Sequence, residues 1–226
     1  MTQAGLALVV TTIVTAVVHT LIPDHWLPFV LVSRAGRWTV RRTVILTAGS
    51  AALHVVVSIS LGLLLVIAGL GAEKAVVGLA ERLESASGWL LVGFGLAYMI
   101  WFLARGGHVH SFGIHPHHTA GEPPPDTGDV GRKHLTGVTL ALIVGFNPCI
   151  LVLPCVYGAA QLDALTLLAV ALAFSVSTIG TMVAVTLLGL HGTSRLTSPF
   201  LTRYGEAFSG GLIALTGLLV LLAEFG

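Results

Sequence analysis

Charged residues are scarce in this chain. Asp, Glu, Lys and Arg make up 9% of its 226 residues, hydrophobic residues make up 55%, and the mean hydropathy is +0.94. Soluble domains contain roughly 25% charged residues, so this composition excludes an ordinary soluble fold and indicates a membrane protein. The formal net charge is only +1, and no basic stripe with interleaved aromatic residues suggests nucleic-acid binding.

The amino terminus also lacks the basic residues that begin a cleavable signal peptide, and its apolar run passes the polar cluster without a small-residue cleavage site. A helix that spans a bilayer needs about 20 predominantly apolar residues. Six segments approach or exceed this length, at residues 5–33, 43–70, 88–104, 137–160, 164–190 and 209–225. We therefore predict an all-α polytopic membrane protein with six transmembrane helices.

The basic residues lie outside the cores of these segments and indicate an orientation. Lys74 and Arg82 follow the second segment. The other nine basic residues follow the first, third and fifth segments: Arg34, Arg37, Arg41, Arg42, Arg105, Arg132, Lys133, Arg195 and Arg203. Because cytoplasmic loops carry an excess of Lys and Arg, we expect these three loops to be cytoplasmic and both termini to be outside.

The first predicted helix is interrupted near its midpoint by the stretch His19-Thr20-Leu21-Ile22-Pro23-Asp24-His25-Trp26-Leu27-Pro28. Ionisable groups at the membrane centre cost at least ~2.5 kcal/mol, so they usually face a cavity, a partner or a substrate. Pro23 and Pro28 remove backbone donors and free the carbonyls of His19 and Asp24. An unbroken helix would point His19 and His25 roughly 120° apart. We predict a broken helix with His19, Asp24 and His25 as candidate metal ligands; the alternative is a simple kink.

The fourth predicted helix contains a second interruption, Gly145-Phe146-Asn147-Pro148-Cys149, followed by Pro154-Cys155. Asn followed by Pro is typical of a helix start, so we expect Asn147 to be an N-cap and Pro148 to be the first residue of a half-helix. The prolines at 148 and 154 repeat the pattern at 23 and 28. Three helices separate the two patterns, which indicates a 3+3 inverted repeat with broken helices 1 and 4.

This repeat divides the chain into residues 1–104, a loop at 105–136, and residues 137–226. The loop is rich in Gly and Pro and contains six of the ten histidines: His108, His110, His115, His117, His118 and His134. His-rich tracts often bind metal loosely, although the loop could also be a solvated linker.

His54 interrupts the second helix and is either a ligand or a packing residue. The run from Ser175 to Thr181 in the fifth helix either lines a pathway or packs tightly.

The spacing of His19, Asp24 and His25 resembles the H-x4-D-H signature of the nickel/cobalt permease family. The segment around it is also similar to that of the related nickel/cobalt efflux permeases, which carry a His-rich cytosolic loop. This resemblance implies metal-ligand roles for His19, Asp24 and His25, a matching second-helix histidine at His54, and a location in a prokaryotic plasma membrane. The fourth helix differs, because Asn147-Pro148-Cys149 resembles elements of thiol-conducting oxidoreductases related to cytochrome c biogenesis proteins.

These features favour a transporter of a divalent transition metal over an enzyme. The predicted site consists of His19, Asp24, His25, His54, Asn147 and Cys149. Ni²⁺ or Co²⁺ would be the transported ion, with Zn²⁺ as a further candidate, and efflux is slightly favoured because a cytosolic His tract could collect ions there. We expect no tightly bound cofactor. The expected partners are membrane lipids and the metal, with a homo-oligomer left open.

Two other functions compete with transport. A thiol-disulfide electron conductor would use Cys149 and Cys155, but cysteines six residues apart on one helix exceed the ~7 Å Cα limit for a disulfide unless Pro154 unwinds the chain. Such a conductor is expected to have one cysteine in each half, and the first helix has none. An accessory protein that only holds metal would need no breaks in mid-membrane.

Overall fold

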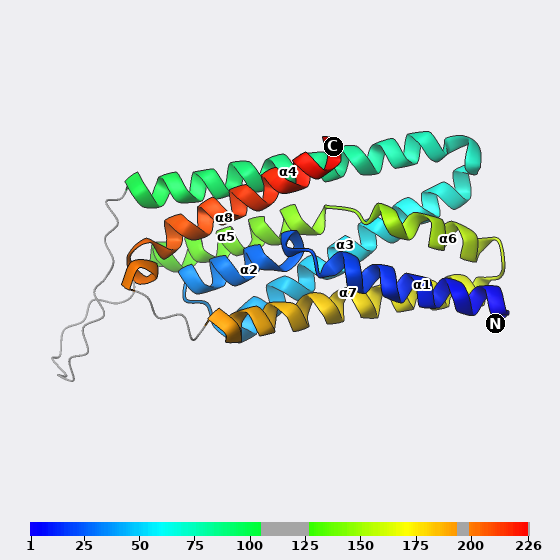
Figure 1. Ribbon diagram of the computed structural model, residues 1–226, viewed down its shortest axis with the longest axis horizontal. Coiled ribbons are helices and arrows are strands. Elements are labelled where there is room, and N and C mark those ends of the chain that lie inside the picture. Colours follow the sequence, from blue (N-terminus) through cyan, green and yellow to red (C-terminus); the bar gives the residue numbers. More distant parts are fainter. Residues whose placement is uncertain (105–126, 194–198, 226) are drawn as a thin grey trace.

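The computed structural model describes residues 1–104, 127–193 and 199–225. Every regular element in these ranges is helical, and together they form an elongated bundle (Figure 1). The elements are α1 (Gln3–Thr20), α2 (Pro23–Ala35), α3 (Val40–Ala68), η1 (Leu70–Ala72), α4 (Glu73–Ala104), α5 (Thr127–Gly145), η2 (Ile150–Val152), α6 (Leu153–Ala160), α7 (Ala164–Thr193) and α8 (Pro199–Phe225). The all-α prediction is confirmed over the described chain.

Four helices, α1, α3, α4 and α7, are long and apolar enough to cross a membrane. The end of α5 and the η2–α6 segment form one further candidate span, bent by 41° at the break between them. In α8 the apolar stretch Ala207–Leu222 is shorter than a full span. Over the described residues, the structure therefore supports an integral membrane protein with four or five candidate spans and does not confirm the count of six.

The helix boundaries refine the predicted segments. The first predicted segment is two helices, as the predicted break requires, because Pro23 begins α2. In α4 no proline interrupts the chain between Glu73 and Ala104. The chain reverses before α4, at Gly69, whose φ of 76° suits glycine. The start of the predicted fourth segment, 137–160, is wrong, because α5 begins at Thr127.

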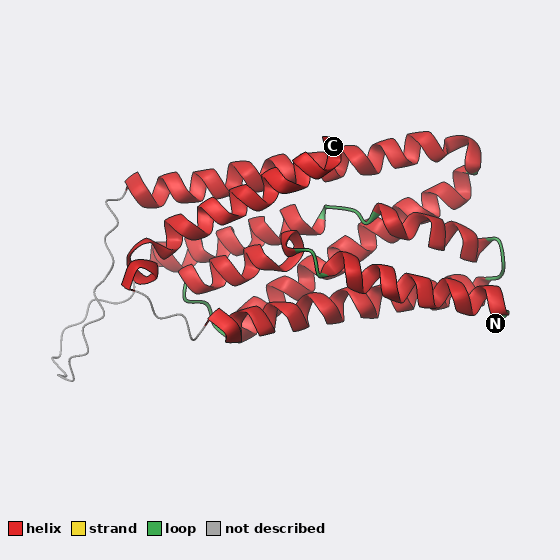
Figure 2. Cartoon of the chain, viewed as in Figure 1, coloured by secondary structure: helices red, strands yellow, loops and turns green. Residues whose placement is uncertain are grey.

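The turns that connect the helices lie at the two ends of the elongated bundle. In Figure 1, α2, α4 and α7 end, and α3, α5 and α8 begin, at the end opposite the N-terminus. The turn from α2 to α3 brings Arg34, Arg37, Arg41 and Arg42 to this end. We call it the arginine-rich end. The α1–α2 and α5–η2 breaks both lie near the middle of the bundle's length, as the loops in Figure 2 show.

Candidate metal site

A proline forms the break between α1 and α2, and local hydrogen bonds satisfy the backbone carbonyls that the break leaves free. Pro23 takes a first-turn position of α2, where its missing N–H costs nothing. The carbonyl of His19, which we expected to be free, accepts from the N–H of Ile22 at 3.1 Å. The Nε1–H of Trp26 donates to the carbonyl of Leu21 at 3.1 Å. The prediction of a free His19 carbonyl was wrong because the turn supplies its own donors.

The break brings two histidines of the first segment together, and α3 adds a third. The ring centroids of His19 and His25 are 4.5 Å apart. The ring of His54 lies 5.9 Å from that of His19 and 5.3 Å from that of His25. An unbroken helix would have separated His19 and His25 by about 9 Å along its axis. The predicted convergence of the two histidines is therefore present in the fold.

The second break contributes a thiol to the same place. One ligand atom each from His19, His54 and Cys149 lie within 4.8 Å of one another. Cys149 lies between α5 and η2, with an extended backbone. We expected Asn147 and Pro148 to begin the second half-helix, but η2 begins at Ile150 and α6 has its proline, Pro154, in the first turn.

A hydroxyl on α3 fixes the thiol's backbone to the histidine helix. The Oγ of Ser58 accepts a hydrogen bond from the N–H of Cys149 at 2.8 Å and donates one to the carbonyl of His54 at 2.7 Å. Ser58 thus ties the second break to the turn of α3 that carries His54. Nothing in the sequence marks Ser58 as part of a site, although its position four residues after His54 puts it on the same helix face.

The polar atoms of this group lack partners. His25 and His54 are each 1% exposed, and Asn147 is 7% exposed. No hydrogen-bond partner is present in the described chain for Nε2 of His19, Nε2 of His25, either ring nitrogen of His54, or Oδ1 of Asn147. A buried polar atom without a partner costs about 1–3 kcal/mol. The fold therefore concentrates lone pairs, at a cost in stability, where a cation would satisfy them.

Asp24 contacts a histidine in this group. Its Oδ1 lies 2.5 Å from Nδ1 of His25, and both side chains are buried. A carboxylate that accepts from Nδ1–H leaves Nε2 of the same ring as a lone-pair donor. With Asp24 accepting from Nδ1–H, Nε2 of His25, one of the unpartnered atoms, would face a cation with its lone pair. The carboxylate charge would also offset part of a divalent cation's charge.

All six residues predicted as ligands lie at the two breaks or on the neighbouring turn of α3. His19, His25, His54 and Cys149 come together; Asp24 touches His25; Asn147 lies two residues before Cys149 in the second break. The histidines of the predicted loop at 105–136 lie outside the described side chains. The two cysteines are free and buried, and both belong to one apolar cluster with Val156 and Phe174.

We expect Ser58→Ala to weaken metal binding about tenfold, a loss typical of residues that orient metal ligands. The substitution leaves the buried N–H of Cys149 without its acceptor, which we expect to cost about 1–3 kcal/mol of stability. Metal titration and thermal unfolding of the purified protein measure both effects. Ser175→Ala is the matched control, because Ser175 bonds to Ala171 of its own helix. Equal behaviour of the two variants would contradict the role assigned to Ser58.

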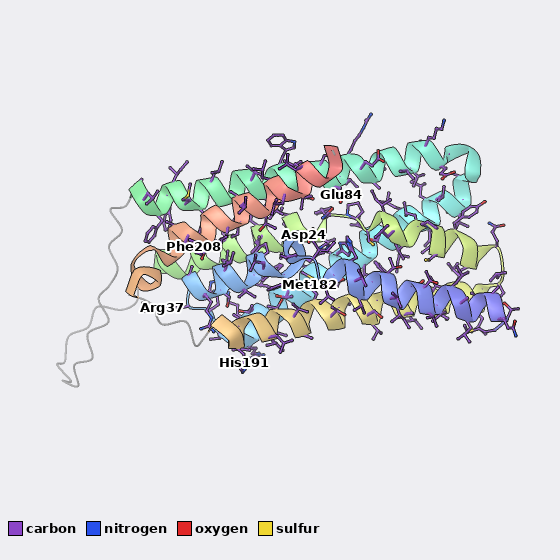
Figure 3. The ribbon with its side chains drawn as sticks, in the orientation of Figure 1. Asp24, Arg37, Glu84, Met182, His191 and Phe208 are labelled. Carbon is purple, nitrogen blue, oxygen red and sulfur yellow. The ribbon has the colours of Figure 1, made fainter. Side chains whose placement is uncertain are left out.

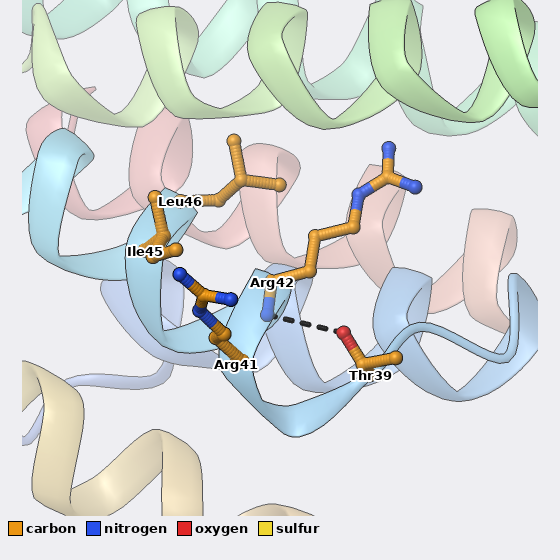
Figure 4. Close-up of a pocket in the computed structure, with 5 residues that line it drawn as sticks. All are labelled: Thr39, Arg41, Arg42, Ile45 and Leu46. Carbon is orange, nitrogen blue, oxygen red and sulfur yellow. Dashed lines mark hydrogen bonds between the residues drawn. The ribbon is translucent and has the colours of Figure 1, made fainter.

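A separate surface pocket of about 350 Å³ lies at the start of α3 and is lined by Thr39, Arg41, Arg42, Ile45 and Leu46 (Figure 4). Thr39 caps the helix by accepting from the N–H of Arg42 at 3.3 Å. The guanidinium of Arg42 lies over the ring of Trp38, 4.6 Å from its centroid. The pocket contains none of the predicted ligands.

The geometry of the candidate site thus consists of three imidazoles, one thiol and one carboxylate, held between two broken helices and α3. These side chains come from positions far apart in the sequence, so their convergence is a property of the fold. In comparisons with known proteins, no family model, curated protein or solved structure matches this chain.

Proposed function

We propose that this protein transports a divalent transition metal ion across a membrane, with Ni²⁺ or Co²⁺ as the favoured ion and efflux as the favoured direction. The observation that carries the proposal is the group of His19, His54 and Cys149, whose ligand atoms lie within 4.8 Å of one another. This group lies between helices that break near mid-length, and broken helices at that depth are where many transporters bind their substrates.

The donor set fits a borderline transition metal. Imidazole nitrogens bind Ni, Co, Zn and Cu, whereas Mg²⁺ and Ca²⁺ prefer oxygen ligands. The thiolate of Cys149 would shift the preference further towards softer ions. Cysteine binds metal as thiolate, so each binding event would release the proton of Cys149. Nε2 of His25, whose ring contacts Asp24, is the candidate for a fourth donor, although His25 lies outside the group of three ligand atoms.

Two pairs of helix contacts are consistent with a 3+3 inverted repeat, the architecture that we propose for the transporter. The repeat pairs α1 with α5, α2 with α6, α3 with α7, and α4 with α8. The contact between α1 and α7 then has its counterpart between α5 and α3. The contact between α2 and α7 likewise corresponds to that between α6 and α3. In this arrangement the arginine-rich end is cytoplasmic, and the His-rich loop collects ions on that side.

The electron-conductor alternative requires both thiols, whereas transport requires only Cys149. We expect Cys155→Ser to keep most of the metal flux and Cys149→Ser to change the preference among Ni²⁺, Co²⁺ and Zn²⁺ more than the rate. The measurement is metal flux in proteoliposomes that contain the full-length protein. Cys155 is the internal control, because it is buried in the same apolar cluster as Cys149 but lies outside the metal-ligand group.

The result that would overturn the proposal is also specific. If the wild-type protein moves none of the three ions, transport of these metals is excluded. If both cysteine variants lose all function and the two thiols form a disulfide that cycles with a membrane reductant, the conductor is the correct function.

A further inference from the structure

A row of buried hydroxyl groups without partners leads away from the candidate metal site. Thr47 and Ser50 on α3, and Thr178 and Thr186 on α7, are at most 1% exposed. Their Oγ atoms have no hydrogen-bond partner in the described part of the chain. In membrane helices such hydroxyls ordinarily bond to the carbonyl four residues earlier. Thr12 and Thr216 do so here, at 2.7 and 2.8 Å, so the missing bonds distinguish this set.

These hydroxyls lie on one face of each helix. Thr47, Ser50 and His54 follow one another at helical spacing on α3, and Thr178 and Thr186 follow Phe174 on α7. The rings of His54 and Phe174 are 6.3 Å apart, which fixes how the two antiparallel helices align. Ser50 and Thr178 are each one turn from this contact, towards the arginine-rich end. The two polar faces therefore extend from the site in the same direction.

On the other side of the site the same faces are apolar. The buried face of α3 continues from Ser58 to Leu61 and Leu65, and the buried face of α7 contains Val170 and Phe174. Thr166 is also buried on α7, but its hydroxyl donates to Asp163 at 2.9 Å. Within the described parts of α3 and α7, unpartnered hydroxyls therefore lie on one side of the site alone.

We propose that these four hydroxyls line the path by which the metal ion passes between the candidate site and the arginine-rich end. This inference rests on the proposed transport function. Neutral hydroxyl oxygens can replace some of the waters around a divalent cation, and they bind it more weakly than carboxylates do, so the ion can leave again. Neither α3 nor α7 presents a carboxylate on this face. Met182, 1% exposed, lies between Thr178 and Thr186 and forms the narrow apolar step of the path.

Two contacts between helices close the outer end of the path. The hydroxyls of Ser33 on α2 and Thr43 on α3 are 2.6 Å apart. The guanidinium of Arg34 on α2 donates to the carbonyl of Leu190 on α7. Both contacts involve α2, the helix that carries His25 and Asp24. Movement of α2 away from α3 and α7 would open the path. In Figure 3, Asp24 and Met182 lie near mid-length, and Arg37 and His191 lie towards the arginine-rich end.

The test replaces single hydroxyls with methyl groups in the full-length protein. We expect Thr178→Val and Thr186→Val to lower the flux of Ni²⁺, Co²⁺ or Zn²⁺ into proteoliposomes by about tenfold or more, with metal affinity at the site changed less than about twofold. Thr178→Ser keeps the hydroxyl and should restore the flux. Thr216→Val is the control, since the Thr216 hydroxyl bonds within its own helix, α8. It should leave the flux unchanged.

Each outcome decides the question. If the hydroxyls only pack, both valine variants will transport normally and unfold at a higher temperature, because each has lost an unpartnered buried polar atom. That result overturns the path and leaves the transport function intact. If the wild-type protein binds none of the three ions, the proposed function fails and the path fails with it. A flux defect that Thr178→Ser does not restore also overturns the path, because it assigns the defect to altered packing.

Discussion

We expect His54→Leu to lose metal binding by about 100-fold or more while the protein remains folded. His54 contributes a ring nitrogen to the group with His19 and Cys149, and removing a metal ligand should cost at least as much affinity as removing a residue that only orients one. Leucine is of similar size and fills the same buried space. It also removes two ring nitrogens that have no hydrogen-bond partner in the described chain. We therefore expect the free energy of unfolding to rise by about 1–3 kcal/mol.

The combination of lost binding and gained stability distinguishes a functional histidine from a packing histidine. Isothermal titration with Ni²⁺, Co²⁺ and Zn²⁺ gives the affinity, and thermal unfolding of the metal-free protein gives the stability. His191→Leu is the matched control, because His191 is an exposed histidine near the end of α7. Unchanged affinity in His54→Leu would exclude His54 from the site. A large loss of stability would show that its ring is held by packing.

The first break could be predicted from sequence because its cause is local. Pro23 has no N–H to donate to the preceding turn and suits the first turn of a helix, so it locates the start of α2. Pro28, by contrast, lies inside α2 without ending it. The convergence of His19 and His25 follows from Pro23. The cap at Asn147 was predicted by the same reasoning and was wrong. Two prolines follow it: the chain is extended at Cys149 after the first, and the second, Pro154, lies in the first turn of α6.

The rest of the site depends on contacts between helices that sequence pattern does not specify. Ser58 is unremarkable in the sequence, and its role appears only when the second break brings the N–H of Cys149 within 2.8 Å. The hydroxyls that lack hydrogen-bond partners also could not be identified from the sequence. The spacing of Thr47, Ser50 and His54 predicts a shared face, but whether each hydroxyl bonds to its own helix is decided by its surroundings. The run from Ser175 to Thr181 was open between pathway and packing, and the structure separates its members: Ser175 bonds within its helix, while Thr178 does not.

Glycines in these helices differ in their use for the same reason. Gly210 and Gly217 of α8 pack closely: a Cβ on Gly210 would lie 2.7 Å from the carbonyl oxygen of Gly95, and one on Gly217 would lie 2.7 Å from that of Gly88. Gly49 of α3 does not, because a Cβ on Gly49 would meet no atom of a neighbouring helix within 4 Å. Small residues permit close approach in membranes, and only the partner helix decides which of them are used.

We expect Gly95→Ala to destabilise the protein by about 3 kcal/mol or more, since relief of the clash requires a backbone shift. A Cβ on Gly95 would lie 2.4 Å from the backbone nitrogen of Ala214 and 2.5 Å from the carbonyl oxygen of Gly210, so α4 and α8 would have to separate. Gly93→Ala is a control in the same helix: a Cβ there would meet nothing within 4 Å, and alanine should stabilise α4 by up to about 1 kcal/mol.

The α4–α8 contact also bears on the site, because α8 packs against α2, the helix that carries Asp24 and His25. Separation of α4 from α8 should therefore loosen His25 and weaken metal binding, whereas Gly93→Ala should leave binding unchanged. Unfolding in detergent at a series of denaturant concentrations, with and without metal, measures both effects. If Gly95→Ala lowers stability but binds metal as the wild type does, α8 supports the fold without positioning α2. If the two alanine variants are equally stable, the close approach of α4 and α8 is not a source of stability.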